Sequence, residues 1–208
     1  MTITVLIIII TCLVSVPLLN NEEGKEKVLF WPYEINHRNE YFRFFSGALV
    51  HADLMHLAFN MMTLYSFGSA IETFLYPVYF QDKSRLLYVL LYVLGAVFAS
   101  IPDYIKYREV YAYRALGASG AVSAVIFAAI LLEPSMPLRF FFIPIDIPGW
   151  LFGILFLALS AYLAKRGRDN IGHSAHFWGG VFGLVFTYIA VRLFTDVNVL
   201  ERFIKAIF

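Results

Sequence analysis

Six long apolar segments alternate with shorter polar stretches along the chain. They cover about residues 2–19, 53–75, 86–102, 117–133, 149–165 and 173–194. Each segment is close to the ~20 residues that an α-helix needs to cross about 30 Å of hydrocarbon. Because backbone polar groups in lipid must be hydrogen-bonded within their own segment, the pattern predicts six membrane-spanning helices.

The composition is that of a membrane protein. Hydrophobic residues make up 60% of the 208 residues and charged residues 15%, whereas a soluble domain has about 25% charged residues. The net charge of +1 and the single cysteine, Cys12, exclude a basic nucleic-acid binder and a disulfide scaffold. A disordered chain is excluded by the same apolar content. The expected fold is one all-α membrane domain over residues 1–208, a polytopic bundle of six transmembrane helices.

The segments between the predicted helices differ in character. Residues 20–52 combine charge with many aromatic side chains, which is typical of a loop in the membrane interface. Residues 134–148 contain four prolines and are expected to form a punctuated return loop. Residues 196–208 are mildly amphipathic and are expected on the membrane surface. Residues 1–2 carry no Lys or Arg, so the first segment is interpreted as a retained span rather than a signal peptide.

The distribution of Lys and Arg bears on the orientation in the membrane. Six spans place both termini on one side, and that side carries six of the 16 Lys and Arg residues, against ten on the other. The positive-inside rule would place the side with ten in the cytoplasm. The margin is modest, because the long 20–52 loop supplies four of the ten.

Three polar clusters interrupt the apolar segments, and polar groups in spans are costly enough to suggest a function. In the first cluster, His56 and Asn60 lie four residues apart on one helix face, and His51 lies at the mouth of the same span. Hydrogen bonding between helices, worth only about 0.6 kcal/mol on average, is the alternative. Two donors on one face, with a third nearby, favour a functional site.

The second cluster is Gly117-Ala118-Ser119-Gly120, which by itself is more typical of close helix packing than of chemistry. A helix from Ser119 to Leu132 is about 21 Å long, so its start falls roughly 9 Å short of the far side of the hydrocarbon. Ser119 would then lie below the membrane surface at a helix N-terminus. Free N–H groups and the helix dipole favour a developing negative charge there.

The third cluster contains His176, followed by Gly179, Gly180 and Gly183. Glycines at this spacing let two helices approach closely, and His176 shares the face of Gly180 and Gly183. If that face packs on the fourth segment, the His176 ring can reach Ser119. Taken alone, His176 is better explained as a buried neutral histidine bonded to a backbone carbonyl.

Together the three clusters meet the requirements of nucleophilic acyl transfer. The Ser119 hydroxyl is a poor nucleophile unless a base such as His176 takes its proton. His56, Asn60 and the Ser119 N–H are candidate donors to the oxyanion of the tetrahedral intermediate. The sequence places no acidic residue to orient His176, so a Ser–His dyad is expected rather than a triad.

In their order and spacing, these motifs resemble the rhomboid family of intramembrane serine proteases. The resemblance runs from about residue 42 to residue 183. The three motifs that carry it are His51-x4-His56-x3-Asn60, Gly117-x-Ser119-Gly120 and Ala175-His176-x2-Gly179-x3-Gly183. Gly68 and Glu72 also resemble residues of the family, and for these two we expect structural hydrogen bonding.

The resemblance implies a role for each site residue. The catalytic dyad would be Ser119 and His176. The remaining groups would support the reaction: His56, Asn60 and the Ser119 backbone as an oxyanion hole, Gly117 as the residue that permits the turn, and His51 as a supporting hydrogen-bond residue. Ser123 stands where relatives often have an aromatic residue or glycine near the catalytic histidine, so we expect His176 to be oriented differently here.

The resemblance also implies the setting of the reaction. Substrates would be single-span membrane proteins, cleaved in or near the membrane segment, with membrane lipid as the surroundings. Neither a metal ion, an organic cofactor nor a nucleic-acid partner is implied. Both termini would face the cytoplasm of a bacterial cell (inner) membrane, against the Lys and Arg count. The oligomeric state stays open.

Two other classes of function compete with this interpretation. A non-catalytic rhomboid-like scaffold would bind membrane segments, although such proteins typically lack the serine or the histidine. A transporter or metal-binding protein would use His51, His56, His173 and His176, but no Cys, Asp or Glu ligand pattern accompanies them.

Overall fold

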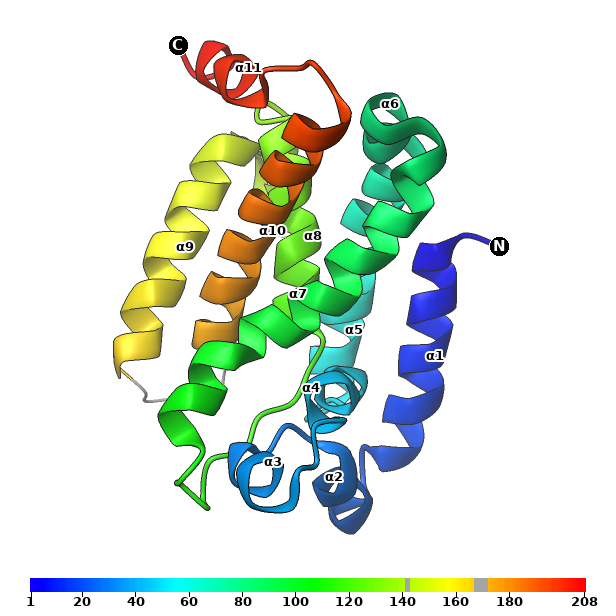
Figure 1. The fold of residues 1–208 in the computed structure, drawn as a ribbon, viewed down its shortest axis with the longest axis vertical. Helices are drawn as coiled ribbons and strands as arrows, with labels where there is room; N and C mark the ends of the chain where they lie inside the picture. Colours follow the sequence, from blue (N-terminus) through cyan, green and yellow to red (C-terminus); the bar gives the residue numbers. More distant parts are fainter. Residues whose placement is uncertain (141–142, 167–171) are drawn as a thin grey trace.

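The computed structural model describes residues 1–140, 143–166 and 172–208, which are mostly helical (Figure 1). The helices are α1 (Ile3–Leu18), α2 (Glu22–Val28), α3 (Pro32–Arg38), α4 (Arg43–Ser46), α5 (Leu54–Thr63), α6 (Tyr76–Phe80), α7 (Ser84–Tyr107), α8 (Ser119–Leu132), α9 (Gly149–Arg166), α10 (His173–Phe194) and α11 (Val199–Lys205). The strands β1 (Pro137–Phe140) and β2 (Ile143–Pro148) form an antiparallel hairpin. Helices cover all six apolar segments.

Within the described residues, three helical stretches can cross a membrane by length and composition: Leu54–Tyr107, α9 and α10. α1 and α8 are apolar but shorter. The first stretch has two arms, since α5 continues through π-helical turns into α6 and the chain then turns back into α7 (Figure 1). Gln81 lies at the reversal with a φ of 47°. The chain is therefore a helical membrane protein.

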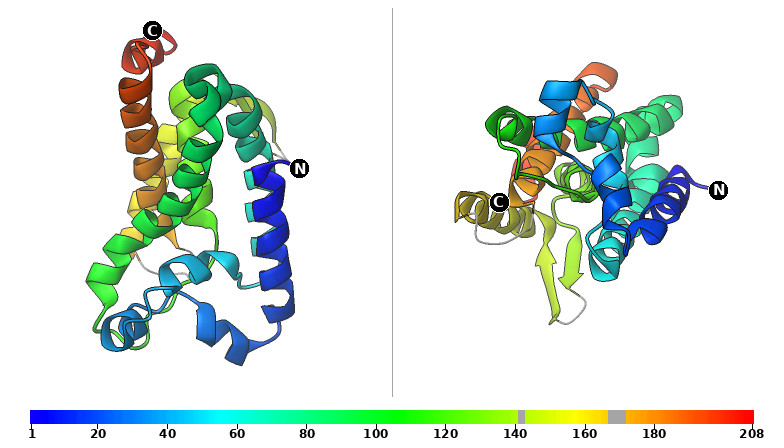
Figure 2. Two further views of the ribbon diagram at one scale, coloured as in Figure 1. Left: turned by 45° about the vertical axis from the view of Figure 1, so that its right-hand side comes forward. Right: turned by 90° about the horizontal axis from the view of Figure 1, so that it is seen from below.

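α8 is the central helix of the bundle. All of its residues from Gly120 to Leu132 are buried, and its sequence is apolar on every side, as expected for a helix surrounded by protein. α7, α9, α10 and the continuation of α5 pack around it (Figure 1, Figure 2). Its first residue, Ser119, is partly exposed. Ser119 is thus the residue of this helix that a ligand can reach.

α1 lies at the edge of the bundle (Figure 1), and a carboxylate holds its N-terminus. Glu72 accepts hydrogen bonds from the N–H groups of Ile3 and Thr4 at 2.7 and 2.8 Å and from the Thr4 hydroxyl at 2.8 Å. These are groups that a helix cannot satisfy internally. A Cβ on Gly68 would lie 2.5 Å from the Tyr88 hydroxyl oxygen, which also bonds Thr4. The expected structural role of Gly68 and Glu72 is confirmed.

Residues 20–52 fold into the short helices α2, α3 and α4 near the end of the bundle where α8 begins (Figure 1). Arg43 is buried and donates to the carbonyl oxygens of Glu26 and Leu29, both at 2.9 Å. Phe30 and Ala115 exchange backbone hydrogen bonds, which join this region to the chain that leads into α8. The region therefore supports the start of the central helix.

Residues 134–148 were predicted from their prolines to form a return loop, but they contain a β-hairpin. This hairpin projects from the bundle (Figure 2). Arg139 of β1 pairs with Asp146 of β2 at 2.8 and 3.0 Å. This hydrogen-bonded contact lowers the pKa of the Asp146 carboxyl. Proline is tolerated in edge strands, and both strands of a two-stranded ribbon are edges. The predicted amphipathic tail contains α11.

Candidate functional site

The chain makes a tight turn just before α8. Gly117 has a φ of 115°, a conformation open to glycine but strained for other residues. Its N–H donates to the Gly47 carbonyl oxygen at 2.9 Å. α8 then begins at Ser119 and ends at Leu132, as predicted. Because the first N–H groups of a helix have no acceptor within it, free donors lie beside the Ser119 side chain.

α8 and α10 touch through their backbones. A Cβ on Gly179 would overlap the Gly120 carbonyl oxygen, and a Cβ on Gly183 would overlap the Ala124 carbonyl oxygen. Neither glycine can be enlarged without moving a helix. The prediction that the helix of His176 packs on the fourth segment is confirmed. We refer to these four contacting residues as the α8–α10 junction.

The junction brings Ser119 and His176 close together. A Cβ on Gly120, the residue after Ser119, would lie 3.5 Å from the carbonyl oxygen of Ala175, the residue before His176. No hydrogen bond joins the side chains of Ser119 and His176, both of which the structure describes. Catalytic hydrogen bonds are often long or poorly aligned before substrate binds.

An aromatic ring from α9 lies against His176. The ring centroids of Phe156 and His176 are 5.9 Å apart, with the planes tilted by 35°. Ser123 is buried in α8 and supplies no ring, so the aromatic neighbour of His176 comes from α9. No sequence pattern singles out Phe156, because an aromatic residue in an apolar helix is common. Gly180, expected on the face of His176, packs against the Phe127 ring.

His56 lies against the turn that precedes Ser119. A Cβ on Gly117 would lie 2.7 Å from Cε1 of the His56 ring and 2.9 Å from Nε2, so glycine is needed here for space as well as for its φ. Asn60 lies one turn further along α5 and donates to the His56 carbonyl oxygen at 2.9 Å. An amide NH₂ carries two hydrogens, so one remains for another acceptor.

His51 is buried between α1 and the same turn. It is 1% exposed, and its Nε2 accepts a hydrogen bond from the Ala118 N–H at 3.4 Å. Its Nδ1 bonds the Ser15 hydroxyl at 3.1 Å, and its ring meets the His56 ring edge to face at a centroid distance of 5.0 Å. His51 therefore contacts the backbone next to Ser119 and not Ser119 itself.

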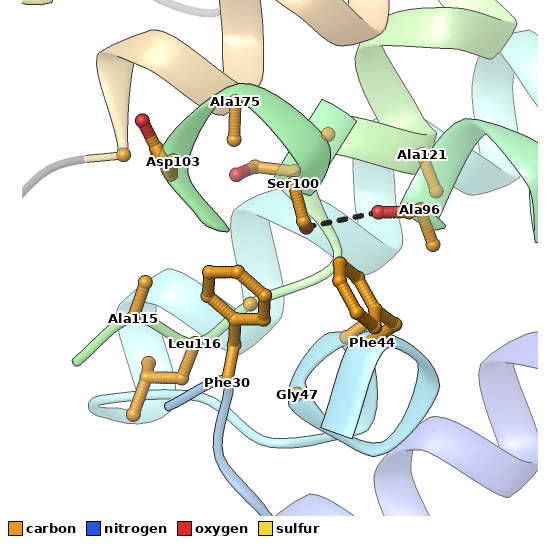
Figure 3. A pocket seen from close by; sticks show the side chains of 15 residues that line it. Phe30, Phe44, Gly47, Ala96, Ser100, Asp103, Ala115, Leu116, Ala121 and Ala175 are labelled. Carbon is orange, nitrogen blue, oxygen red and sulfur yellow. Dashed lines mark hydrogen bonds between the residues drawn. The ribbon is translucent and has the colours of Figure 1, made fainter. Parts of the chain in front are cut away.

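A small cavity of about 40 Å³ lies beside Ser119 (Figure 3). Its walls include Phe30 and Phe44 of the 20–52 region and the buried Asp103 of α7. Asp103 accepts a hydrogen bond from the Tyr113 hydroxyl at 2.8 Å. Burial, and then the neighbouring Asp103, raise the pKa of Tyr113. The Tyr113 hydroxyl therefore stays protonated and keeps donating to this carboxylate.

Comparison with known proteins gives a consistent set of matches. A family model described as Rhomboid domain matches residues 38–193. "RHOMBOID-like protein 12, mitochondrial" of Arabidopsis thaliana is 30% identical over 67% of this chain and 44% of its own length. "Rhomboid protease GlpG" of Haemophilus influenzae is 24% identical over 84% of this chain and 83% of its own length. "Rhomboid protease GluP" of Bacillus subtilis is 28% identical over 70% of this chain and 26% of its own length.

The matched regions differ in extent. The chain spans less than half the length of the two Arabidopsis relatives that it matches, 44% and 42%. α1 lies outside the matched domain, which starts at residue 38.

Proposed function

Because the chain belongs to the rhomboid family, we propose that it is an intramembrane serine endopeptidase. His176 takes the proton of the Ser119 hydroxyl as Ser119 attacks the scissile carbonyl carbon, and the proton then passes to the leaving amine. Water then attacks the acyl carbon and gives a proton to His176. His176 returns this proton to the Ser119 oxygen as the acyl C–O bond breaks and the new carboxyl end leaves. This dyad chemistry requires neither a metal ion nor an organic cofactor.

The observation that carries this proposal is the backbone contact between α8 and α10. Gly120 and Gly179 touch, and they follow Ser119 and His176 by one and three residues in helices that start at the same end of the bundle (Figure 1). A nucleophile and a base need such a fixed separation, because hydrogen-bond reach is only about 3 Å.

The oxyanion is stabilised by donors from two elements. The Ser119 N–H lies at the start of α8, and His56 lies against Gly117. Asn60 contributes the amide hydrogen that the His56 carbonyl does not use. Donors held in place before the reaction stabilise the negative charge without reorganisation.

The proposed enzyme crosses the membrane six times, with α1 and α8 as its short spans. Its substrates are single-span membrane proteins, cut in or near the membrane segment, since Ser119 would lie about 9 Å below one membrane surface. Both termini face the cytoplasm of a bacterial cell membrane. A reporter fused after Phe208 should then give a cytoplasmic signal, and an external signal would show that the positive-inside count was correct.

A non-catalytic rhomboid-like scaffold is the second candidate. It is favoured by the missing hydrogen bond between the described side chains of Ser119 and His176, and by relatives whose printed names say only rhomboid-like. Such a scaffold would bind membrane segments and leave them intact.

Labelling with a serine-directed fluorophosphonate separates the two candidates. The wild type should be labelled and Ser119→Ala should not. Ser123→Ala is the matched control, because Ser123 is a second serine in α8, one turn further on and buried. It should be labelled like the wild type. A wild type that takes up no phosphonate and cuts no membrane substrate would establish the scaffold instead.

A further inference from the structure

We propose that Ser15 of α1 is a positioning residue for the nucleophile. It fixes the ring of His51, and His51 holds the N–H of Ala118, the residue before Ser119. The effect on catalysis rests on the proposed function, whereas the geometry of the three residues does not.

The three residues form a continuous, buried hydrogen-bonded chain. The Ser15 hydroxyl oxygen lies 3.1 Å from Nδ1 of His51, and the Ala118 nitrogen lies 3.4 Å from Nε2. Ser15 is fully buried, Ala118 likewise, and His51 is 1% exposed. Water therefore cannot take the place of a partner that is removed, and each bond counts more than it would at a surface.

The direction of these bonds follows from the donors. Ala118 N–H can only donate, so Nε2 of His51 must present its lone pair. A neutral imidazole then carries its hydrogen on Nδ1, and this N–H donates to the Ser15 oxygen. The Ala118 N–H therefore selects this tautomer, and the Ser15 hydroxyl supplies the acceptor that its Nδ1–H needs. Without the hydroxyl, Nδ1–H would be buried with no acceptor, whereas the opposite tautomer would set Nε2–H against the Ala118 N–H. The His51 ring would then rotate out of its position.

The contacts at the N-terminus of α1 fix the position of this helix along its own axis. This position explains why Ser15 lies beside His51. Glu72 binds the N–H groups of Ile3 and Thr4 at the start of the helix. Ser15 lies about 16 Å further along the helix from Thr4 at 1.5 Å per residue. A slip of α1 by one residue would break the Glu72 contacts and move Ser15 away from His51. The two contacts therefore define one register.

The backbone N–H groups just before α8 differ in whether they already have an acceptor. The Gly117 N–H is bound to Gly47, and the Ala118 N–H is bound to His51. The next N–H in the chain is that of Ser119, the proposed oxyanion donor. By binding the Ala118 N–H, the Ser15–His51 pair orients the Gly117–Ala118 peptide unit, which lies one peptide unit before the Ser119 N–H.

The test combines a structural and a kinetic measurement on the full-length protein in detergent or lipid nanodiscs. Nitrogen-15 NMR of labelled histidines reports which ring nitrogen of His51 carries hydrogen, with assignment by His51→Gln. Cleavage of a fluorogenic single-span substrate gives kcat and KM. The variants are Ser15→Ala, Ser15→Thr, which keeps a hydroxyl, and Thr11→Ala. Thr11 is the matched control, since it is equally buried, lies one turn earlier in α1 and has no bond to His51.

We expect the wild type, Ser15→Thr and Thr11→Ala to show the Nδ1–H tautomer of His51. In Ser15→Ala the ring-nitrogen signals of His51 should move from their wild-type positions, because Nδ1–H loses its acceptor and the ring rotates away from the Ala118 N–H. The value of kcat should fall roughly 3- to 10-fold with KM unchanged. An unchanged His51 signal in Ser15→Ala overturns the proposal. So does a shifted signal with unchanged kcat, or an equal loss of kcat in Thr11→Ala, which would reflect general loosening of α1.

Failure of the proposed function gives a different result. If the wild type neither cleaves substrate nor takes up phosphonate, the enzyme assignment and the catalytic role of Ser15 are both wrong. The His51 signal in Ser15→Ala still decides whether Ser15 fixes the His51 ring.

Discussion

The two sides of the candidate site are built in different ways. On the α8–α10 side, backbones meet at Gly120, Gly179, Ala124 and Gly183, and shape alone sets the distance. On the α1 side, side chains meet through hydrogen bonds, between Thr4 and Glu72 and between Ser15 and His51. The first contact fixes Ser119 and His176, the proposed nucleophile and base, relative to each other. The second orients the turn from which the nucleophile projects.

This difference has a physical consequence. Glycine contacts tolerate no added atom, so they should fail abruptly when a side chain is enlarged. Buried hydrogen bonds can be weakened one at a time, so the α1 side should fail by degrees.

The largest effect is expected from substitutions of Ser119 and His176, which the α8–α10 junction brings close together. Ser119→Ala and His176→Ala should each lower kcat by roughly 10⁶-fold, because neither group of a dyad works without the other. The double variant should be no worse than either single one. Losses that multiply in the double variant, measured by turnover of a membrane substrate, would mean that the two residues act independently.

The next effect concerns His56 and Asn60, which lie between the two sides. His56→Ala and Asn60→Ala should each lower kcat by about 10²–10³-fold, the usual cost of losing one oxyanion donor. KM should change little, because the oxyanion exists only in the transition state. Rates of phosphonate labelling should fall in parallel. If His56 and Asn60 only pack between helices, the two substitutions should instead lower the melting temperature and leave kcat per folded molecule nearly unchanged.

A third experiment disrupts the α8–α10 junction by adding a single methyl group. Gly179→Ala places a methyl group on the Gly120 carbonyl oxygen, so overpacking should cost about 1–3 kcal/mol of unfolding free energy and reduce labelling of Ser119. Gly172→Ala is the matched control, since among the described residues its Cβ would meet only Ala175, at 3.8 Å. Equal effects of the two substitutions would argue against a steric junction.

The smallest expected effect weakens the α1 side while keeping its shape. Glu72→Gln removes the charge from the acceptor of the Ile3 and Thr4 N–H groups. Bonds to charged groups contribute about 1.5–3 kcal/mol against about 1 kcal/mol for neutral ones, so the loss should be about 1–2 kcal/mol. Thermal unfolding should show it, and labelling per folded molecule should be unchanged. A loss of labelling beyond the unfolded fraction would tie α1 more closely to Ser119 than we infer.

The α8–α10 side of the site could be predicted from the sequence better than the α1 side. The helix start at Ser119 and the packing of the His176 helix on α8 were readable from local glycine and serine spacing. Ser15 was not, because one serine in an apolar helix carries no local sign of a partner 36 residues away. Phe156 was missed for the same reason. The hairpin was missed because prolines such as Pro137 and Pro148 usually indicate the end of a strand, whereas here they pair with each other in two edge strands.

The burial of α8 determines how different parts of the molecule should open. A helix enclosed on all sides, with another backbone pressed against it, can expose its amides to solvent only when the whole bundle separates. The β1–β2 hairpin projects from the bundle and can open without disturbing α8 (Figure 2). In native-state hydrogen exchange, the α8 amides from Val122 onwards should therefore exchange last and report the global unfolding free energy.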